Sequence, residues 1–307
     1  MRRPLHATEG GTARLVAYYG AGAAGFTVGQ QDRKRRQANR IARADSAWTW
    51  AVVALFLAVV VFGIRTLATG TSRVMPELRA VVIDQLSPRY LNESFRESTV
   101  ASLEAFGLPV ELFEGEDVDV SLYRSLAGRQ PGVILIRSHS GILVLEGEEE
   151  QRVTALFTNE PYRETAHVAE QLNDRLLVVR PFQDDAVLTF GVSPAFVSRS
   201  MQGNLPGSIV IIAGCSCLGR RDLADAFIAR GASVVVSWDG SVTLDHVDEA
   251  TALLVEKLFR EGTTLENAVI AAMVKYGRDP DFGALMTYFP VAAGRYTAAQ
   301  LLGQSRR

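Results

Sequence analysis

Cysteine and histidine are both scarce in this sequence. Its 307 residues include two cysteines and four histidines. The cysteines, Cys215 and Cys217, are two positions apart, a separation that strains a disulfide. A metal site would need further ligands at suitable spacing. Residues 245–249, "DHVDE", offer some, but their acids equally suit the first turn of a helix. We therefore expect neither a metal ion nor another cofactor.

A surplus of positive charge is also missing from most of the chain. Residues 1–46 carry nine Lys or Arg and three Asp or Glu, whereas the other 261 residues carry 23 and 31. Nothing in that balance indicates nucleic-acid binding. The glycine-rich run "GAGAAG", residues 20–25, fits a dinucleotide pattern, but no βαβ unit follows it, so we expect no nucleotide there.

One segment lacks charge altogether. Residues 46–64, "SAWTWAVVALFLAVVVFGI", are about long enough to cross a membrane as a helix. The basic residues precede them, which favours a cytoplasmic N-terminus. We predict a basic cytoplasmic tail (1–45), an uncleaved transmembrane signal-anchor (46–68), a linker (69–78) and an extracytoplasmic α/β domain (79–307). A cleaved signal peptide is the rival interpretation, but its apolar core is usually shorter and it has no 45-residue leader.

From residue 79 onward, short apolar runs alternate with helical patterns. Strands are predicted at 79–86, 108–113, 132–139, 176–180, 186–192, 207–214 and 232–238, and a hairpin at 141–158. Helices are predicted at 92–106, 120–127, 194–201, 218–229, 245–260 and 264–276. Residues 207–214 are the most continuous apolar run, as in strands buried on both faces. The fold class is α/β, a three-layer sandwich with a mostly parallel sheet and a hairpin insertion.

Reactive side chains directly follow two of these strands. In "VILIRSHSG" the apolar run is followed by His139, and in "IVIIAGCSC" it is followed by Cys215. Sites form at the carboxyl ends of central parallel strands, so the two side chains are expected to meet there. An imidazole activates a cysteine nucleophile, and a helix starting near residue 218 would favour the thiolate further. Backbone N–H groups around Gly214 and Cys215, and those of Ser140 and Gly141, are expected to hold a developing oxyanion.

The motifs "SHSG" and "AGCSCLG" resemble those of the caspase–gingipain–separase clan of cysteine peptidases, which includes CHAT domains. That clan places a His, usually followed by Gly, after one apolar strand, and a Cys preceded by a small residue, here Gly214, after the next. The stretch "GASVVVSWDGSVTLDHVDEATALLVEKLF" is similar to the segment after the nucleophile in separases and CHAT domains. The resemblance covers about residues 79–272 and implies a caspase-like sandwich with His139 and Cys215 as catalytic residues. Ser140 departs from the clan's usual Gly.

A substrate preference also follows from the resemblance. In caspases the strand after the nucleophile ends in Ser-Trp-Arg, and the Arg receives an acidic substrate side chain. This chain has Ser237, Trp238 and Asp239, which inverts the charge, as in separases, which cut after Arg. We therefore expect Ser237, Trp238 and Asp239 to form part of the substrate site, with Asp239 binding a basic residue just before the scissile bond. An Asp before Gly240 equally suits an ordinary turn.

The sequence thus predicts a membrane-anchored cysteine peptidase acting on a peptide or protein substrate. The alternative is a catalytically inactive caspase-fold binding or scaffold module at the membrane, which Ser140 and the lack of an evident activating pro-segment favour. A redox sensor using the two thiols is a third class, and Cys215 as an inert core residue is a fourth. Cys217 is interpreted as a bystander, and the sequence assigns no oligomeric state.

Overall fold

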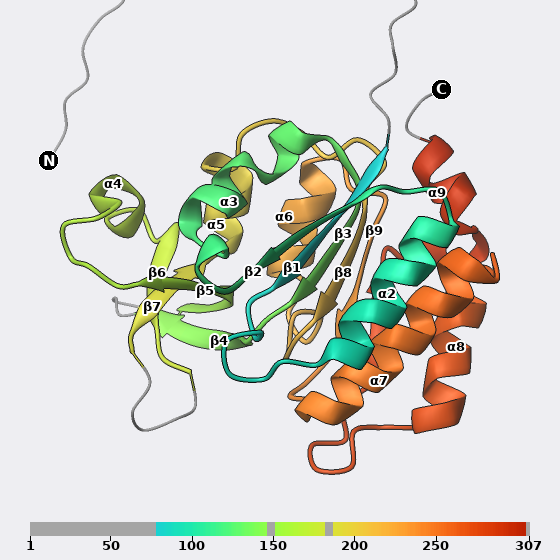
Figure 1. Cartoon of the computed structure of the whole chain (residues 1–307). Coiled ribbons are helices and arrows are strands. Elements are labelled where there is room, and N and C mark those ends of the chain that lie inside the picture. Colours follow the sequence, from blue (N-terminus) through green and yellow to red (C-terminus); the bar gives the residue numbers. More distant parts are fainter. Residues whose placement is uncertain (1–77, 146–150, 182–186, 305–307) are drawn as a thin grey trace, which may run out of the picture. The chain divides into compact units, whose positions relative to one another are not determined.

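Figure 1 shows the computed structural model, which describes residues 78–145, 151–181 and 187–304. Its main element is a six-stranded sheet in which only the edge strand β10 runs antiparallel to its neighbour. In spatial order the strands are β2 (Val110–Glu114), β1 (Arg79–Asp84), β3 (Pro131–Arg137), β8 (Ile209–Ala213), β9 (Val234–Trp238) and β10 (Met286–Phe289). Every residue of β3, β8 and β9 is buried, which explains their continuous apolar sequences.

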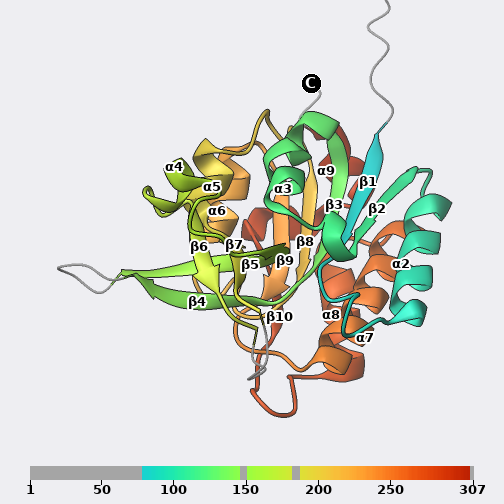
Figure 2. The same cartoon turned by 60° about the vertical axis from the view of Figure 1, so that its left-hand side comes forward.

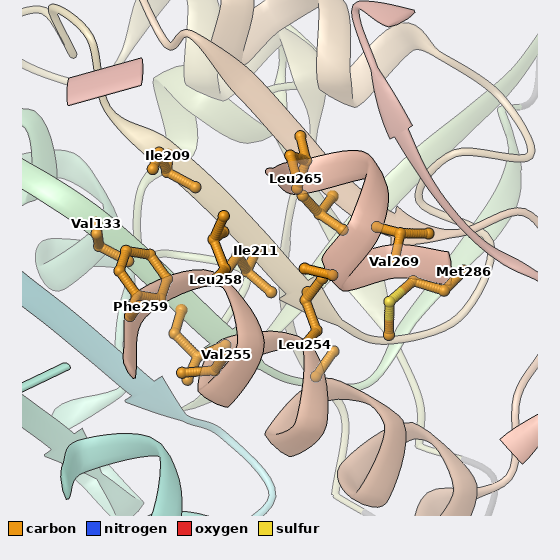
Figure 3. Packing of buried hydrophobic residues seen from close by; sticks show 14 of the residues in the cluster. Val133, Ile209, Ile211, Leu254, Val255, Leu258, Phe259, Leu265, Val269 and Met286 are labelled. Atoms are coloured by element: carbon orange, nitrogen blue, oxygen red, sulfur yellow. The ribbon is translucent and has the colours of Figure 1, made fainter. Parts of the chain in front are cut away.

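Helices cover both faces of this sheet (Figure 1). One face of the sheet, called the α7 face from here on, packs against four helices. They are α2 (Glu93–Ala105), α7 (Leu244–Val255) with its π-helical continuation Glu256–Arg260, α8 (Leu265–Tyr276) and α9 (Ala298–Gln304). The opposite face, called the α6 face, packs against α3 (Val120–Ser125), α5 (Pro194–Arg199) and α6 (Asp222–Ala229). Figure 3 shows part of the α7-face core, where Leu254 and Leu258 lie close to Ile211. Alternate residues of each strand enter opposite cores, as the pleat requires.

A second, antiparallel sheet is inserted between β3 and β8 (Figure 2). Its strand order is β4 (Ser140–Leu145), β5 (Gln151–Pro161), β7 (Thr189–Val192) and β6 (Leu176–Val179). One face of this sheet adds Leu156 and Phe190 to the α6-face core, and the other holds a small cluster that includes Phe157. Short helices complete the described part: η1 (Gly115–Asp117), η2 (Leu126–Arg129), α4 (Val168–Gln171) and η4 (Val291–Arg295).

The predicted α/β class with a mostly parallel sheet is confirmed. Three features differ from the predictions: β10 and α9 were not expected, and the strands predicted at 176–180 and 186–192 join the hairpin in a separate sheet. The predicted basic tail and transmembrane segment, residues 1–68, lie outside the described residues. Within the described ranges, none of the helices combines the length and the apolar character that a membrane crossing needs.

Candidate active site

The central strands β3 and β8 end side by side at the carboxyl edge of the six-stranded sheet. Their last register pair is Arg137 with Ala213. His139 and Cys215 each follow two residues later, so they leave neighbouring strands at the same level, and both are half-buried. The Ser140 hydroxyl donates a hydrogen bond to the carbonyl oxygen of Cys215 at 2.7 Å, which ties the two segments together. The structure therefore brings the expected base and nucleophile to the same end of adjacent strands.

The side chains of His139 and Cys215 nevertheless face different neighbours, and no hydrogen bond joins these two described side chains. The imidazole lies edge-on to Tyr90 and tilted against Phe157, with ring centroids 6.0 and 6.1 Å apart. The thiol donates to the carbonyl oxygen of Val242, 3.6 Å away. The Cys215 side chain must therefore turn away from Val242 before the imidazole can take its proton.

Val242 belongs to the loop that follows β9, and Asp279 anchors that loop. One Asp279 carboxylate oxygen accepts hydrogen bonds from the Thr243 N–H at 2.7 Å and the Thr243 hydroxyl at 2.8 Å. The other oxygen accepts the N–H groups of Asp281 and Phe282. The position of the Val242 carbonyl, and with it the orientation of the thiol, is thus set by a buried carboxylate.

Both reactive groups are uncharged at neutral pH. Burial raises the pKa of the Cys215 thiol above its ordinary value; the backbone of Val242 partly opposes this, and the negative charge of Asp279 adds to it. Burial lowers the pKa of the His139 imidazole, and the positive charge of Arg137 lowers it further. The resting pair is a neutral thiol and a neutral imidazole, in contrast to the thiolate expected from the sequence. A neutral imidazole can serve as a general base that takes the proton during attack.

The expectation that a helix dipole favours a Cys215 thiolate is wrong. α6 begins at Asp222, not near residue 218, and residues 217–221 form a turn and a bend before it. α6 covers the α6 face of the sheet, whereas Cys215 packs against the core of the α7 face. The Asp222 carboxylate lies in the first turn of α6 and binds the N–H and hydroxyl of Thr154. The N-terminus of this helix therefore faces other partners.

Cys217 lies on the opposite side of the sheet from Cys215. It is fully buried in the α6-face core, and burial raises the pKa of its thiol to about 12. Ser216 between them has a φ of 56°, and this left-handed residue turns the chain sharply. Both thiols are free. The two cysteines are therefore separate groups, and neither is present as a thiolate at neutral pH.

The ladder between β4 and β5 decides which backbone N–H group is available for an oxyanion. Ser140 is opposite Leu156, and the Phe157 N–H donates to the carbonyl oxygen of His139. In an antiparallel ladder this makes Ser140 and Leu156 a pair without mutual hydrogen bonds, so the Ser140 N–H points away from β5. The Gly141 N–H points into the ladder instead. Of the two expected donors on β4, Ser140 is therefore the available one.

A second donor is the N–H of Cys215 itself, which has no hydrogen-bond partner among the described residues. Gly214 lets this segment pass close to β4. A Cβ at position 214 would lie 2.6 Å from both the Ser138 carbonyl oxygen and the Ser140 Oγ, closer than real Cβ contacts. The small residue before the cysteine is thus required by the approach of two chain segments, and its role is steric.

The three residues predicted to bind substrate occupy different environments. Ser237 is buried and donates its hydroxyl to the carbonyl oxygen of Ile212 at 2.8 Å. Trp238 is fully buried in the α7-face core. Asp239 is exposed, and its Oδ1 accepts the Leu285 N–H at 2.7 Å. Only Asp239 presents its side chain to solvent, so Ser237 and Trp238 support the segment from inside.

Hydrogen bonds place this segment beside the cysteine loop. The Ser216 N–H donates to the Gly240 carbonyl oxygen at 2.8 Å, and the Leu218 N–H donates to the Trp238 carbonyl oxygen at 2.9 Å. Asp239 therefore lies at the surface next to the turn that carries Cys215.

A pair of amides that we did not predict fixes the backbone of His139. Gln85, just beyond β1, accepts the His139 N–H at 2.9 Å and donates to the Asn159 side chain at 2.8 Å. Both amides line a cavity of about 120 Å³ that His139 also borders, together with Tyr90 and Thr189. The signal in the sequence was a polar residue, Gln85, directly after the strand Arg79–Asp84.

A buried ion-pair network that we also did not predict lies beneath the site. Arg137 is 1% exposed and forms two hydrogen bonds with Asp248 of α7, at 2.7 and 2.8 Å, and two with Asp84 of β1, at 2.9 and 3.2 Å. The Asn92 side chain, which caps α2, also donates to Asp248. The network joins β1, β3, α2 and α7, and its central residue, Arg137, precedes His139 by two positions. Asp248 thus pairs with a buried cation and does not serve as a first-turn acid.

In the described ranges, no cluster of three or more His, Cys, Asp or Glu side chains is arranged to hold a metal ion. No protein-family model matches the chain, and no curated protein is significantly similar to it. The function of this protein must therefore be inferred from its own motifs and geometry.

Proposed function

We propose that this protein is a cysteine peptidase with a caspase-like fold, in which His139 and Cys215 form the catalytic dyad. The observation that carries the proposal is the shared level of these two residues at the ends of adjacent central strands. Two backbone donors without partners in the described structure, on Ser140 and Cys215, lie beside them. The strand order, with the cysteine strand between the histidine strand and the Trp238 strand, supports the resemblance to the caspase clan.

The chemistry follows from these positions. The Cys215 thiol leaves Val242 and attacks the substrate carbonyl carbon while His139 takes the thiol proton. The N–H groups of Ser140 and Cys215 stabilise the negative charge on the carbonyl oxygen. His139 then gives the proton to the leaving amine, and the C–N bond breaks to leave a thioester. Water attacks this thioester while His139 takes one of its protons, the C–S bond breaks to release the acid, and His139 returns the proton to the Cys215 sulfur.

Substrate preference is the next part of the proposal. Asp239 is exposed beside the cysteine turn, and its second carboxylate oxygen has no partner among the described residues, which supports a role in binding a basic residue before the scissile bond. A panel of fluorogenic peptides tests this preference. Equal cleavage after Leu, Asp and Arg would contradict it.

The test of the dyad is covalent labelling of the full-length chain. A peptidyl acyloxymethyl ketone with Arg at the reactive end is expected to label Cys215 in the wild type. Cys215→Ala should abolish labelling, whereas Cys217→Ala should retain it. His139→Gln should slow labelling by about 10²-fold or more, the usual contribution of a general base.

We further propose that residues 46–68 anchor the protein in the membrane with residues 79–307 outside the cytoplasm. The charge asymmetry and the uncharged run of residues 46–64 support this topology. Sedimentation of the full-length chain with membranes, and resistance of that association to alkaline carbonate, are expected. Release of the wild type by carbonate would exclude a transmembrane anchor.

The second candidate is a catalytically inactive scaffold module of the same fold. The hydrogen bond from the Cys215 thiol to Val242 favours it, because the resting thiol points at a carbonyl group and not at the imidazole. This candidate holds if no acyloxymethyl ketone labels Cys215 and no peptide is cleaved by the folded protein.

A further inference from the structure

β4 is an edge strand without the usual protection. Its sequence, "SGILVL", contains no charge and no proline, and its register with β5 shows no bulge. Natural edge strands commonly carry one of these devices, because unpaired N–H and C=O groups recruit further strands. In the described part of the chain only β5 pairs with β4 (Figure 2). Two of its apolar side chains, those of Ile142 and Val144, are 43% and 55% exposed.

The register identifies the backbone groups that face the open edge. Ser140, Ile142 and Val144 are opposite Leu156, Thr154 and Arg152 in pairs without mutual hydrogen bonds. The N–H and C=O groups of the first three residues therefore point away from β5. No hydrogen bond within the described residues uses them. They form a row of donors and acceptors at every second residue.

This row begins at the candidate active site. Ser140 directly follows His139, and its hydroxyl binds the carbonyl oxygen of Cys215 at 2.7 Å. The first group of the row, the Ser140 N–H, is also the proposed oxyanion donor. A polypeptide whose scissile carbonyl binds this N–H is therefore already aligned with the start of the β4 edge.

We propose that the free edge of β4 binds the leaving-group side of an extended polypeptide substrate as an added parallel β-strand. This inference depends on the proposed peptidase function for its orientation. His139 protonates the leaving amine, so the residues after the scissile bond start beside it. β4 runs away from His139 in the same chain direction.

The proposal defines a substrate class. Main-chain hydrogen bonds to Ser140, Ile142 and Val144 supply affinity for any extended segment. The exposed side chains of Ile142 and Val144 favour β-branched or apolar residues at alternate positions after the cleaved bond. A helical or tightly turned segment cannot form this ladder, so the substrate is an extended loop, tail or unfolded segment.

The first test varies substrate length. Internally quenched peptides with the same acyl side and one, two, four or six residues after the scissile bond are compared for kcat/KM with the full-length chain. The ratio of the six-residue to the one-residue substrate is expected to be about tenfold or more, because several hydrogen bonds are added. Ile142→Pro removes the outward N–H and should bring this ratio close to one. Ile142→Thr retains the N–H and should retain the ratio.

The second test does not require catalysis. The full-length Cys215→Ala protein is incubated with a decapeptide that has Arg at position four and alternating Val and Thr after it. Hydrogen exchange at the amides of Ser140, Ile142 and Val144 should slow at least tenfold, while Gly141 and Leu143 change little. N-methylation of alternate peptide residues in one register should abolish this protection, and methylation in the other register should leave it.

The outcomes separate this inference from the proposed function. Amide protection without any cleavage would support the edge and overturn the peptidase. Cleavage with no length dependence and no amide protection would overturn the edge and keep the peptidase. Concentration-dependent protection of the three amides without peptide would assign the edge to a second copy of this chain and overturn the inference.

Discussion

The thiol of Cys215 donates its hydrogen to the carbonyl oxygen of Val242, and Asp279 holds the loop that carries this carbonyl through Thr243. Burial favours the thiol form by raising the pKa of Cys215, and the interaction with the Val242 backbone only partly offsets this effect. The hydrogen bond to Val242 keeps the nucleophile turned away from the imidazole. Reactivity at Cys215 therefore requires loss of this hydrogen bond.

The first prediction concerns thiol reactivity. Iodoacetamide should label Cys215 slowly at pH 7, and the rate should rise about tenfold for each pH unit through pH 8.5, because burial raises the pKa of this thiol. Mass spectrometry of the single-thiol variant Cys217→Ala gives the rate. In the matched variant Cys215→Ala, the buried Cys217 should stay unlabelled until the protein is unfolded. Fast labelling at pH 6 would show that Cys215 is already a thiolate.

The second prediction concerns the passage of Gly214 beside β4. Gly214→Ala should lower the free energy of unfolding by about 1–3 kcal/mol, because the new Cβ overlaps the Ser138 carbonyl oxygen and the Ser140 Oγ. Gly141→Ala is the matched control, since no atom lies within 4 Å of its Cβ position. Urea denaturation measures both changes. Similar midpoints for the two variants would show that the segment can move apart without cost.

The sequence was sufficient to predict the central strands and the two residues at their ends. Strands β3, β8 and β9 are apolar runs buried on both faces, so their limits are visible in a single sequence. His139 and Cys215 follow two of these runs, so their position at one edge of the sheet is predictable from the geometry of parallel sheets, whereas the directions of their side chains are not. β10 was missed because Met286 is its only buried residue, so its sequence shows neither a buried run nor a clear alternation.

Contacts between distant segments could not be predicted. Asp248 and Arg137 are 111 positions apart, and an acid near a helix start looks the same in sequence whether it faces solvent or a buried guanidinium. The partner of the Cys215 thiol is a backbone carbonyl, which carries no residue signature. The environment of the dyad, and so the charge state of its members, depends on these contacts.

The third prediction tests the buried network. Asp248→Ala should lower the free energy of unfolding by about 3–5 kcal/mol, because it leaves the buried Arg137 charge without its two-point partner. Glu249→Ala, at the exposed neighbouring position, should change it by no more than about 0.5 kcal/mol. If Asp248→Ala does not fold, Asp248→Asn keeps the shape and removes the charge. Urea midpoints equal to that of Glu249→Ala would remove the network from the account of stability.

The fourth prediction concerns His139, whose pKa is lowered by burial and then by Arg137. NMR titration of the full-length chain should give a midpoint below the ordinary value of about 6.5, and the acid limb of kcat/KM should lie below that pH. Since the folded state binds this proton less well than the unfolded state, the contribution of His139 to stability falls as the pH drops below about 6.5. A midpoint above 6.5 would instead indicate an imidazolium paired with a thiolate.

The fifth prediction isolates the charge of Asp239 from its structural role. Asp239→Asn retains an oxygen that can accept the Leu285 N–H, so the turn after β9 should remain intact. The preference for Arg over Leu before the scissile bond, measured as a ratio of kcat/KM, should fall about two- to fivefold, the range for an exposed ion pair. The wild-type preference should weaken in 1 M salt to the level of the variant, because salt screens exposed charges. A preference that survives both the substitution and the salt would place the recognition of the basic residue elsewhere in the site.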